Sequence, residues 1–276
     1  MKHTALVTGA TQGIGLHTAT RLAQTGDYKV IIHARSAESG ARALKLLAAE
    51  SDVRGDCLGE VVTGDLGDLA QVRSVAAQVR DQVRELDVLI NNAGVFTEGP
   101  RRVSAQGHEL TYAVNVLAPF ALTRLLLPVM RPDGGHVLNT ASLSAASRVP
   151  WDDLQLETSY SDHKAYSLSK VLDIMFTLGL HRGLQSLGCP NLRTNCLDPG
   201  TVDTRMLRQG WSMSGIPLSK ANDTFRLATT EASAGSGKYY VGNRVASPPR
   251  VALDPQLQDR LWDVLEGQAA PALATQ

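Results

Sequence analysis

Short aliphatic runs alternate with longer segments of helical period along almost the whole chain. The runs that predict strands cover residues 5–7, 30–32, 58–62, 88–90, 137–139 and 193–197. The helical patterns cover residues 14–25, 37–49, 70–84, 106–127, 165–187 and 219–228, and a last strand at 239–241 precedes a helix at 255–266. This alternation predicts an α/β fold built on a doubly wound parallel sheet of about seven strands, with helices on both faces.

Length and composition are those expected of a single domain spanning residues 1–276. A chain of this size removes roughly three quarters of its unfolded surface from water, which one core can do. No linker or shift in composition divides it, and the Ala/Pro-rich tail from residue 267 is predicted to fray. The 27 basic residues balance the 27 acidic ones, which disfavours nucleic acid or an anionic membrane surface as a partner.

The sequence predicts no leader, membrane span or metal site. The first strand reaches a glycine within nine residues, and no run is expected to supply the ~18 apolar residues that a span requires. Three cysteines without CxxC spacing and seven scattered histidines indicate neither a disulfide framework nor a set of metal ligands. These features predict a cytoplasmic protein.

The first predicted strand leads into the first predicted helix through a glycine-rich turn, Thr8-Gly9-Ala10-Thr11-Gln12-Gly13-Ile14-Gly15. Glycine permits positive φ, lets the backbone approach a ligand and leaves the N–H groups of a helix N-terminus open to an anion. Glycines also serve ordinary tight turns, but between a strand and a helix this spacing predicts a dinucleotide pyrophosphate site, as in a Rossmann fold. The residues assigned to it are Gly9, Thr11, Gln12, Gly13, Ile14 and Gly15.

The end of the second predicted strand indicates which dinucleotide is bound. A Rossmann fold that binds NAD usually places Asp or Glu there, to accept a hydrogen bond from the adenosine 2′-hydroxyl. Here Ala34 occupies that position, followed by Arg35 and Ser36. With no carboxylate to repel a 2′-phosphate and a guanidinium to bind it, NADP(H) is favoured over NAD(H); the alternative is a solvated Arg35 at a helix start. Asp65 and Leu66 are assigned to the adenine, although Asp65 could simply cap a turn.

Four further motifs follow in order. They are Asn91-Asn92-Ala93-Gly94 after the fourth strand, Asn115 in the fifth helix, Ser142 after the fifth strand and Tyr166-Ser167-Leu168-Ser169-Lys170 in the sixth helix. Tyr166 and Lys170 are four residues apart and therefore share one helix face. Together with the glycine turn, this order and spacing resembles the short-chain dehydrogenase/reductase family over about residues 4–241.

The resemblance implies catalytic roles for four residues. Tyr166 would be the general acid in reduction and the base in oxidation, while Lys170 would hold the nicotinamide ribose and favour the ionised tyrosine. Ser142 would hydrogen-bond the substrate oxygen, and Asn115 would hold a proton-relay water through its backbone carbonyl. Pro119 offers a physical reason for that last role, because it has no N–H to donate to this carbonyl; the alternative is a simple kink.

The resemblance also implies further cofactor contacts and a substrate lid. The family binds the nicotinamide carboxamide after the sixth strand and begins its lid there, which places the lid around residues 203–220; the alternative is a helix pair packed on the core. Asp198 departs from the neutral or histidine residue of many members, which bears on the electrostatics of the lid. The implied cofactor residues are Asn92, Ala93, Gly94, Tyr166, Lys170, Pro199, Gly200, Val202 and Thr204.

A second pair, Tyr160 and Lys164, has the same Tyr-x-x-x-Lys spacing. Tyr160 precedes a polar stretch typical of a loop. Tyr166 and Lys170 instead lead into an apolar helix face that would hold them rigidly. We therefore assign the catalytic role to Tyr166.

The 24-residue separation of Ser142 and Tyr166, with Trp151 between them, and the Tyr239-Tyr240-Val241 run resemble the retinol-dehydrogenase-like branch of the family. This similarity suggests a sizeable apolar carbonyl or alcohol as substrate. The candidate substrate residues are Val95, Phe96, Ser144, Trp151 and Trp211. His163 could also reach the substrate, although a solvated loop histidine is the commoner outcome.

The sequence therefore predicts an NADP(H)-dependent oxidoreductase that moves a hydride to or from a carbonyl carbon. Two alternatives remain open: a lyase, cyclase or epimerase that uses the same tyrosine without net redox change, and a non-catalytic NADP-binding regulator. Apolar surface on residues 117–127 and 171–180 would suit a homodimer or homotetramer, but neighbouring helices of the same subunit could cover it instead.

Overall fold

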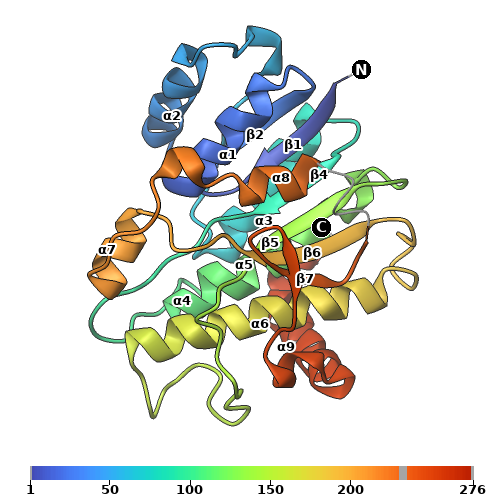
Figure 1. Cartoon of the computed structure of the whole chain (residues 1–276). Coiled ribbons are helices and arrows are strands. Elements are labelled where there is room, and N and C mark those ends of the chain that lie inside the picture. The colour runs from blue at the N-terminus through green and yellow to red at the C-terminus, as the bar shows by residue number, and fades with distance from the viewer. Residues whose placement is uncertain (1, 230–234, 275–276) are drawn as a thin grey trace.

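The computed structural model describes residues 2–229 and 235–274. Its strands are β1 (His3–Val7), β2 (Tyr28–Ala34), β3 (Val62–Thr63), β4 (Val88–Asn91), β5 (His136–Thr140), β6 (Arg193–Asp198), β7 (Lys238–Val241) and β8 (Arg244–Ala246). They form one sheet in the order β3-β2-β1-β4-β5-β6-β7-β8, parallel throughout except for β8 (Figure 1). The chain reverses its direction across the sheet at β1, so the predicted doubly wound, single-domain fold is confirmed.

Helices cover both faces of this sheet. α1 (Gly13–Gln24), α2 (Ala37–Ala49) and α8 (Asp223–Thr229) enclose one apolar core, and α3 (Leu69–Gln82), α5 (Ala118–Leu126) and α6 (Asp162–Gly183) enclose the other. α9 (Pro255–Leu273) packs outside α3, α5 and α6. α4 (Leu110–Tyr112) precedes α5, and α7 (Arg205–Trp211) lies beyond the carboxyl ends of the strands (Figure 1).

The carboxyl ends of the central strands lie side by side. The register pairs Val7 with Ile90, Asn91 with Asn139, and Thr140 with Leu197. Because these strands are parallel, the motifs that follow β1, β4, β5 and β6 meet at one edge of the sheet. That edge is therefore where a site built from the predicted motifs must lie.

The long helix predicted at 106–127 is shorter and irregular. It begins at Leu110, because the Glu109 carboxylate caps it by accepting from the N–H groups of Thr111 and Tyr112 at 2.9 and 2.7 Å. Residues Ala113–Leu117 then form a π-helical turn, in which the Ala118 N–H donates to the Ala113 carbonyl, five residues back. The break in the regular hydrogen-bond ladder thus surrounds Asn115, next to the missing N–H of Pro119.

The same region corrects the expectation that no segment has the length and hydropathy of a membrane span. Leu110–Val129 has both, but 83% of its apolar window is buried inside the protein. It is the core helix between the sheet and α9, and burial on several sides accounts for its hydropathy.

Several predicted boundaries are corrected. The strand expected at 58–62 is reduced to a bridge between Val30 and Leu58 and the two residues of β3. The helix expected at 219–228 divides into a 3₁₀ turn, Leu218–Lys220, and α8. β8 was not predicted from the sequence.

The chain end also differs from the prediction. Helix α9 continues to Leu273 instead of fraying from residue 267, because Ala269 and Ala272 pack into the core that α9 shares with α3, α5 and α6. Residues 275–276 of the predicted tail lie outside the described residues.

Candidate active site

The glycine turn has the shape that a bound pyrophosphate requires. Gly9 and Gly13 have φ angles of +63° and +59°, which residues other than glycine rarely adopt. A Cβ atom at Gly9 would lie 2.8 Å from Ala93 Cα, and one at Gly15 would lie 2.4 Å from Asn92 Nδ2. Gln12, the N-cap of α1, makes no side-chain capping bond. The first N–H groups of α1 therefore remain open to an anion, which fits a dinucleotide phosphate.

The turn is tied to the segment that follows β4. Thr8 Oγ1 accepts hydrogen bonds from the N–H groups of Asn92 and Ala93, both at 3.0 Å. Asn92 Nδ2 donates to the Thr8 carbonyl at 2.9 Å. Two predicted cofactor motifs are thus held as one rigid surface.

His33, which the sequence analysis left without a role, supports the same surface from β2. Its Nδ1 accepts from the Gly9 N–H at 3.2 Å, and its Nε2 lies 2.9 Å from the Gly64 carbonyl. Burial lowers the pKa of His33, against the opposing effects of the Gly64 carbonyl and Asp65. The ring is therefore neutral near pH 7, and a proton on Nε2 satisfies both bonds.

The predicted nucleotide-selecting residues lie at the end of β2 and after β3. Ala34 is buried, whereas Arg35 is exposed and makes no hydrogen bond or ion pair with any residue of 2–229 or 235–274. Ser36 caps α2, accepting from the Ser39 N–H. Asp65 Oδ1 accepts from the Gly67 N–H at 2.8 Å, so this side chain does cap a turn, beside buried Leu66.

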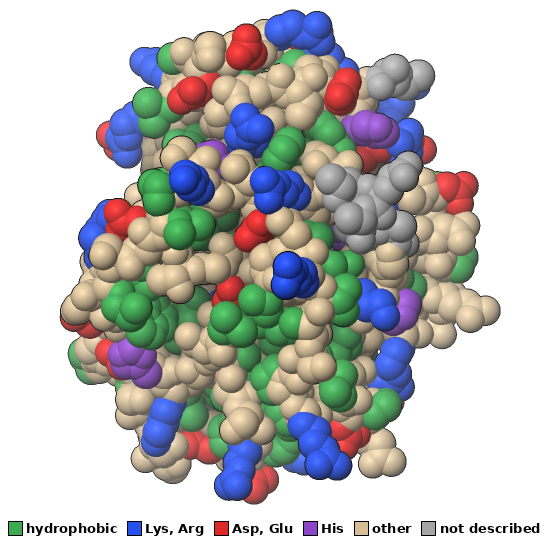
Figure 2. Space-filling view, in the orientation of Figure 1, with side chains coloured by type: hydrophobic (Ala, Val, Ile, Leu, Met, Phe, Trp, Pro, Cys, Tyr) green, Lys and Arg blue, Asp and Glu red, His purple; other side chains and the backbone are tan. Residues whose placement is uncertain are grey.

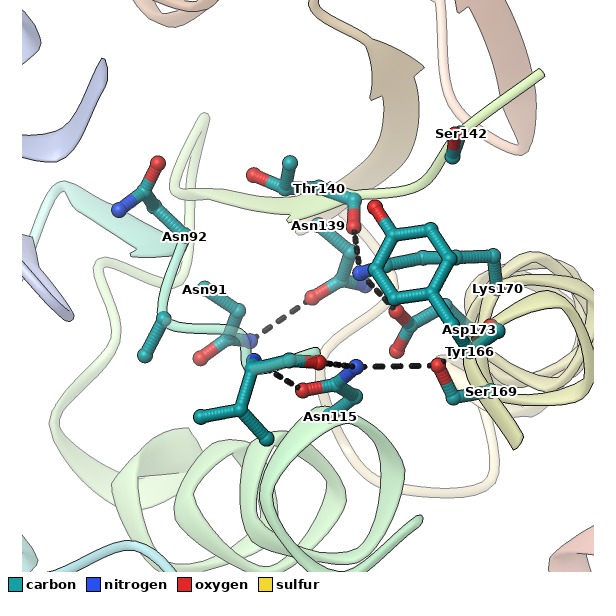
Figure 3. A network of polar contacts seen from close by, with 12 residues as sticks. Asn91, Asn92, Asn115, Asn139, Thr140, Ser142, Tyr166, Ser169, Lys170 and Asp173 are labelled. Carbon is teal, nitrogen blue, oxygen red and sulfur yellow. Dashed lines mark hydrogen bonds and ion pairs between the residues drawn. The ribbon is translucent and has the colours of Figure 1, made fainter. Parts of the chain in front are cut away.

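Tyr166 and Lys170 project from one face of α6, which begins at Asp162 with Ser161 as its cap. Lys170 Nζ donates to the Thr140 carbonyl at 2.7 Å and lies 3.1 Å from Asp173 Oδ2. It also lies 5.7 Å from the centre of the Tyr166 ring (Figure 3). Tyr160 is outside the helix and its hydroxyl donates to the Thr97 carbonyl, which agrees with its assignment to a loop.

Asn115 clamps the backbone on the other side of Tyr166. Its Oδ1 accepts from the Val95 N–H at 2.8 Å, and its Nδ2 donates to the Val95 carbonyl and to Ser169 Oγ, both at 3.0 Å (Figure 3). The side chain therefore joins α6 to the segment after β4. This clamp fixes the position of Phe96, the next residue.

Ser142 and Asp198 are joined through the loop after β5. Ser142 Oγ accepts from the Ser144 N–H at 3.1 Å. The Asp198 carboxylate accepts from the N–H groups of Leu143 at 2.6 Å and Gly200 at 2.7 Å. Asp198 is buried at the end of β6, so its charge holds the Ser142 loop and the Pro199–Gly200 turn together and lies outside the segment predicted to be a lid.

An aromatic cluster packs against the Tyr166 ring. Measured between ring centres, Trp211 lies 5.1 Å from both Tyr166 and Phe96. The His163 ring centre lies 5.1 Å from that of Phe96 and 5.4 Å from that of Trp211. A Cβ atom at Gly210 would lie 3.3 Å from the Phe96 ring, so glycine allows this close approach. No residue of α7 is buried. This helix therefore covers the Tyr166 side of the site and is not packed into the core.

The structure does not bring every candidate substrate residue to this cluster. The Trp151 ring instead lies 4.5 Å from the guanidinium carbon of Arg260 on α9. Val95 and Ser144 contribute backbone contacts to Asn115 and Ser142. Around the site, Leu143, Met213 and Ile216 are exposed, and Figure 2 shows hydrophobic side chains gathered on the surface over α7 and α6.

The predicted cofactor residues Val202 and Thr204 lie in the segment after β6. Thr204 Oγ1 caps α7 by accepting from the Leu207 N–H. Thr204 Cγ2 would lie 3.7 Å from a Cβ atom placed at Gly13, so the start of the segment predicted to be a lid faces the glycine turn. Val202 is buried and pairs with Ile216, which closes the segment between them into a loop.

Asp173 is the main site residue that was not predicted from the sequence. A signal was present, because Asp173 interrupts the apolar run of Val171, Leu172, Ile174 and Met175 on α6. A carboxylate in a buried helix face needs a partner, and Lys170, three residues earlier, was available.

The fold and the site together define a doubly wound nucleotide-binding protein with a tyrosine and a lysine at the carboxyl edge of its sheet. A family model described as short chain dehydrogenase matches residues 3–214. The chain belongs to the short-chain dehydrogenase/reductase family and is an oxidoreductase of that family.

Similar proteins of known name place the chain near one branch of the short-chain dehydrogenase/reductase family. The chain is 33% identical to human retinol dehydrogenase 13, over 99% of this chain and 87% of the relative. It is 34% identical to mouse polyprenol dehydrogenase, over 94% of this chain and 81% of the relative. The predicted similarity to the retinol-dehydrogenase-like branch is confirmed.

Solved structures agree with the fold. An uncharacterised protein of Mycobacterium paratuberculosis superposes with a TM-score of 0.79 at 30% identity, covering 97% of this chain and 93% of that one. A blue fluorescent protein from a metagenomic library, in complex with NADPH, gives a TM-score of 0.66 at 28% identity, covering 87% and 97%.

Proposed function

We propose that the protein is an NADP(H)-dependent oxidoreductase that transfers a hydride between the nicotinamide and a carbonyl or alcohol carbon of a fairly large apolar molecule. The observation that carries the proposal is the position of Tyr166, close to the Lys170 ammonium and in contact with the rings of Phe96 and Trp211. This combines a proton donor, a nearby cation and apolar surroundings for a substrate.

The residues divide the chemistry between them. When bound, the cofactor supplies the hydride in reduction and accepts it in oxidation. Tyr166 gives its hydroxyl proton to the substrate oxygen in reduction and takes it back in oxidation. The Lys170 charge stabilises the ionised hydroxyl that remains. Ser142, held by the Ser144 N–H, donates a hydrogen bond to the substrate oxygen as negative charge develops there.

Arg35 supports the choice of NADP(H). Its guanidinium is exposed at the end of β2, where Ala34 provides no carboxylate, so it is free to bind a 2′-phosphate. The metagenomic relative described above, whose structure contains NADPH, agrees with this choice.

The names of the relatives and the surface of the site support an apolar substrate. Retinol and polyprenol dehydrogenases are named for long apolar alcohols. In this chain the Phe96 and Trp211 rings flank Tyr166, and the exposed side chains of Leu143 and Met213 extend the apolar surface.

The test compares NADPH consumption with alcohol formation for a panel of apolar aldehydes and ketones. We expect equimolar loss of NADPH and gain of alcohol. Product that forms without net loss of NADPH would instead indicate a lyase, cyclase or epimerase. NADPH binding with no product from any member of the panel would favour the non-catalytic regulator.

We also propose that the chain is a monomer, because α9 covers the helices that were candidates for a subunit interface. Trp262 of α9 lies 5.1 Å from Phe120 of α5 and 6.3 Å from Phe176 of α6, measured between ring centres. Arg124 of α5 forms an ion pair with Glu266. Light scattering coupled to sizing chromatography is expected to give the mass of one chain, and a dimer mass for the unmodified protein would contradict the proposal.

A substitution extends this prediction. Trp262→Ala removes ring packing and should lower the free energy of unfolding by roughly 3 kcal/mol, since the ring is only partly buried. Asp263→Ala, on the exposed side of α9, is the matched control and should change it little. Denaturant unfolding measures both.

A further inference from the structure

Asp173 forms a buried ion pair with Lys170 that the proposed mechanism does not yet use. The side chains of Lys170 and Asp173 are only 5% and 4% exposed, and Nζ and Oδ2 are 3.1 Å apart. Such a pair is costly to bury, and removing one partner leaves an uncompensated charge. Because the Lys170 Nζ lies only 5.7 Å from the centre of the Tyr166 ring, the pair calls for a functional explanation.

The geometry of the ammonium group limits where it can point. An ammonium has three N–H donors. One meets the Thr140 carbonyl on β5 at 2.7 Å and a second meets Asp173 on α6 at 3.1 Å. These acceptors occupy two of the three donors and leave one open. The Lys170 Nζ lies 5.7 Å from the centre of the Tyr166 ring, and the close-up view shows the two side by side (Figure 3).

The charge of Lys170 also depends on its neighbours. Burial alone would lower the pKa of Lys170, but the charges of Asp173, Tyr166 and Asp198 outweigh burial and raise it above its ordinary value. Cys196 on β6 faces the same pair, and burial raises the pKa of its thiol, so it stays neutral. Asp173 is thus the nearest carboxylate, with Asp198 at the end of β6 as a more distant one.

Asp173 carries its charge only over part of the pH range. Burial raises the pKa of Asp173 to about 6, although the Lys170 charge opposes that shift. Above about pH 6 the carboxylate is ionised and the pair is intact. The pair weakens as the pH falls below this value.

We propose that Asp173 is a positioning residue that keeps the Lys170 ammonium charged and aimed at Tyr166, so that the tyrosine hydroxyl ionises more readily. The inference deepens the proposed function and rests on it, because Lys170 acts on the substrate only through Tyr166. Asp173 itself touches neither the substrate nor the cofactor.

The test follows the ionisation of Tyr166 in the protein without cofactor or substrate. Ultraviolet difference absorbance reports tyrosinate, and subtracting the same titration of the matching Tyr166→Phe variant isolates Tyr166 from the five other tyrosines. In Asp173→Asn the buried Lys170 should lose its proton, so the Tyr166 midpoint should move to higher pH by about one unit, a tenfold change. Asp81→Asn, an exposed aspartate on α3, is the control and should leave the midpoint unchanged.

A midpoint that stays in place or moves to lower pH in Asp173→Asn would overturn the proposal, because removal of a negative charge by itself favours tyrosinate. The mechanism also requires that the effect pass through Lys170. In a Lys170→Met background, Asp173→Asn should therefore no longer raise the Tyr166 midpoint, as a double-mutant cycle would show.

The same cycle keeps the proposal testable if Asp173→Asn alone does not fold. Lys170→Met/Asp173→Asn removes both charges, and neutral replacements of a buried pair are commonly tolerated. A Tyr166 midpoint in the double variant that equals or lies below that of Lys170→Met supports the proposal, because only the direct repulsion by Asp173 is then lost. A higher midpoint in the double variant would show that Asp173 does not act through Lys170 and overturns it. Because the titration needs no turnover, an absence of NADPH-dependent activity would count against the proposed function and not against this pair.

Discussion

Tyr166→Phe is expected to lower kcat by roughly 10²- to 10⁴-fold, the range that a positioned general acid or base contributes. The substitution removes only the hydroxyl, and the ring keeps its contacts with Phe96 and Trp211. The fold and the binding of NADPH should therefore change little. Initial rates of NADPH oxidation with a reactive apolar carbonyl compound measure the loss, and NADPH fluorescence measures binding.

Tyr160→Phe is the matched control for this prediction. Tyr160 has the competing Tyr-x-x-x-Lys spacing, but its hydroxyl donates to the Thr97 carbonyl at 3.2 Å and lies outside α6. We expect kcat within about twofold of the unmodified enzyme, since Tyr160 is half-buried, keeps its ring and loses only a hydroxyl that contacts no predicted catalytic residue. Full activity in Tyr166→Phe would remove Tyr166 from the mechanism, and a loss in Tyr160→Phe as large as that in Tyr166→Phe would contradict the choice of Tyr166 over Tyr160.

The fold could be predicted because most of its elements have a simple pattern. β1, β4 and β5 are buried on both faces, and each appears in the sequence as a short aliphatic run. β3 and β8 are short strands with partly exposed residues, so they lack that pattern. The continuation of α9 to Leu273 depends on Ala269 and Ala272, whose burial comes from a surface that the sequence alone does not reveal.

The candidate site divides in the same way. Tyr166 and Lys170 lie four residues apart on one helix, so their proximity follows from local geometry. Asp198 and His33 act through partners far along the chain, Leu143 and Gly9, which only the folded sheet brings within hydrogen-bond distance. The direction of the Trp151 ring could not be predicted for a related reason. Its position in the insert suggested a substrate contact, but only the fold shows that the ring lies against Arg260 of α9.

Arg35→Asp is expected to lower the preference for NADPH over NADH, expressed as a ratio of kcat/KM values, by about 100-fold. Hydrogen bonds to charged groups contribute about 1.5–3 kcal/mol each, and a carboxylate in place of the guanidinium adds repulsion of the 2′-phosphate. Arg35 is exposed and Ala34 is buried, so the substitution alters the cofactor surface without creating a cavity. Steady-state kinetics with each cofactor measure the ratio.

One further variant separates the attraction of Arg35 for the 2′-phosphate from the repulsion by an introduced carboxylate, and a second is the matched control. Arg35→Ala removes the attraction alone and should produce an intermediate ratio, and its remaining preference should depend less on salt than that of the unmodified enzyme, because an exposed ion pair is screened. Arg80→Asp makes the same charge change in the last turn of α3, which runs back to the opposite edge of the parallel sheet, and should leave the ratio unchanged. A ratio that Arg35→Asp does not move would show that Arg35 is a solvated side chain, and the choice of NADP(H) would then lose its physical basis in this chain.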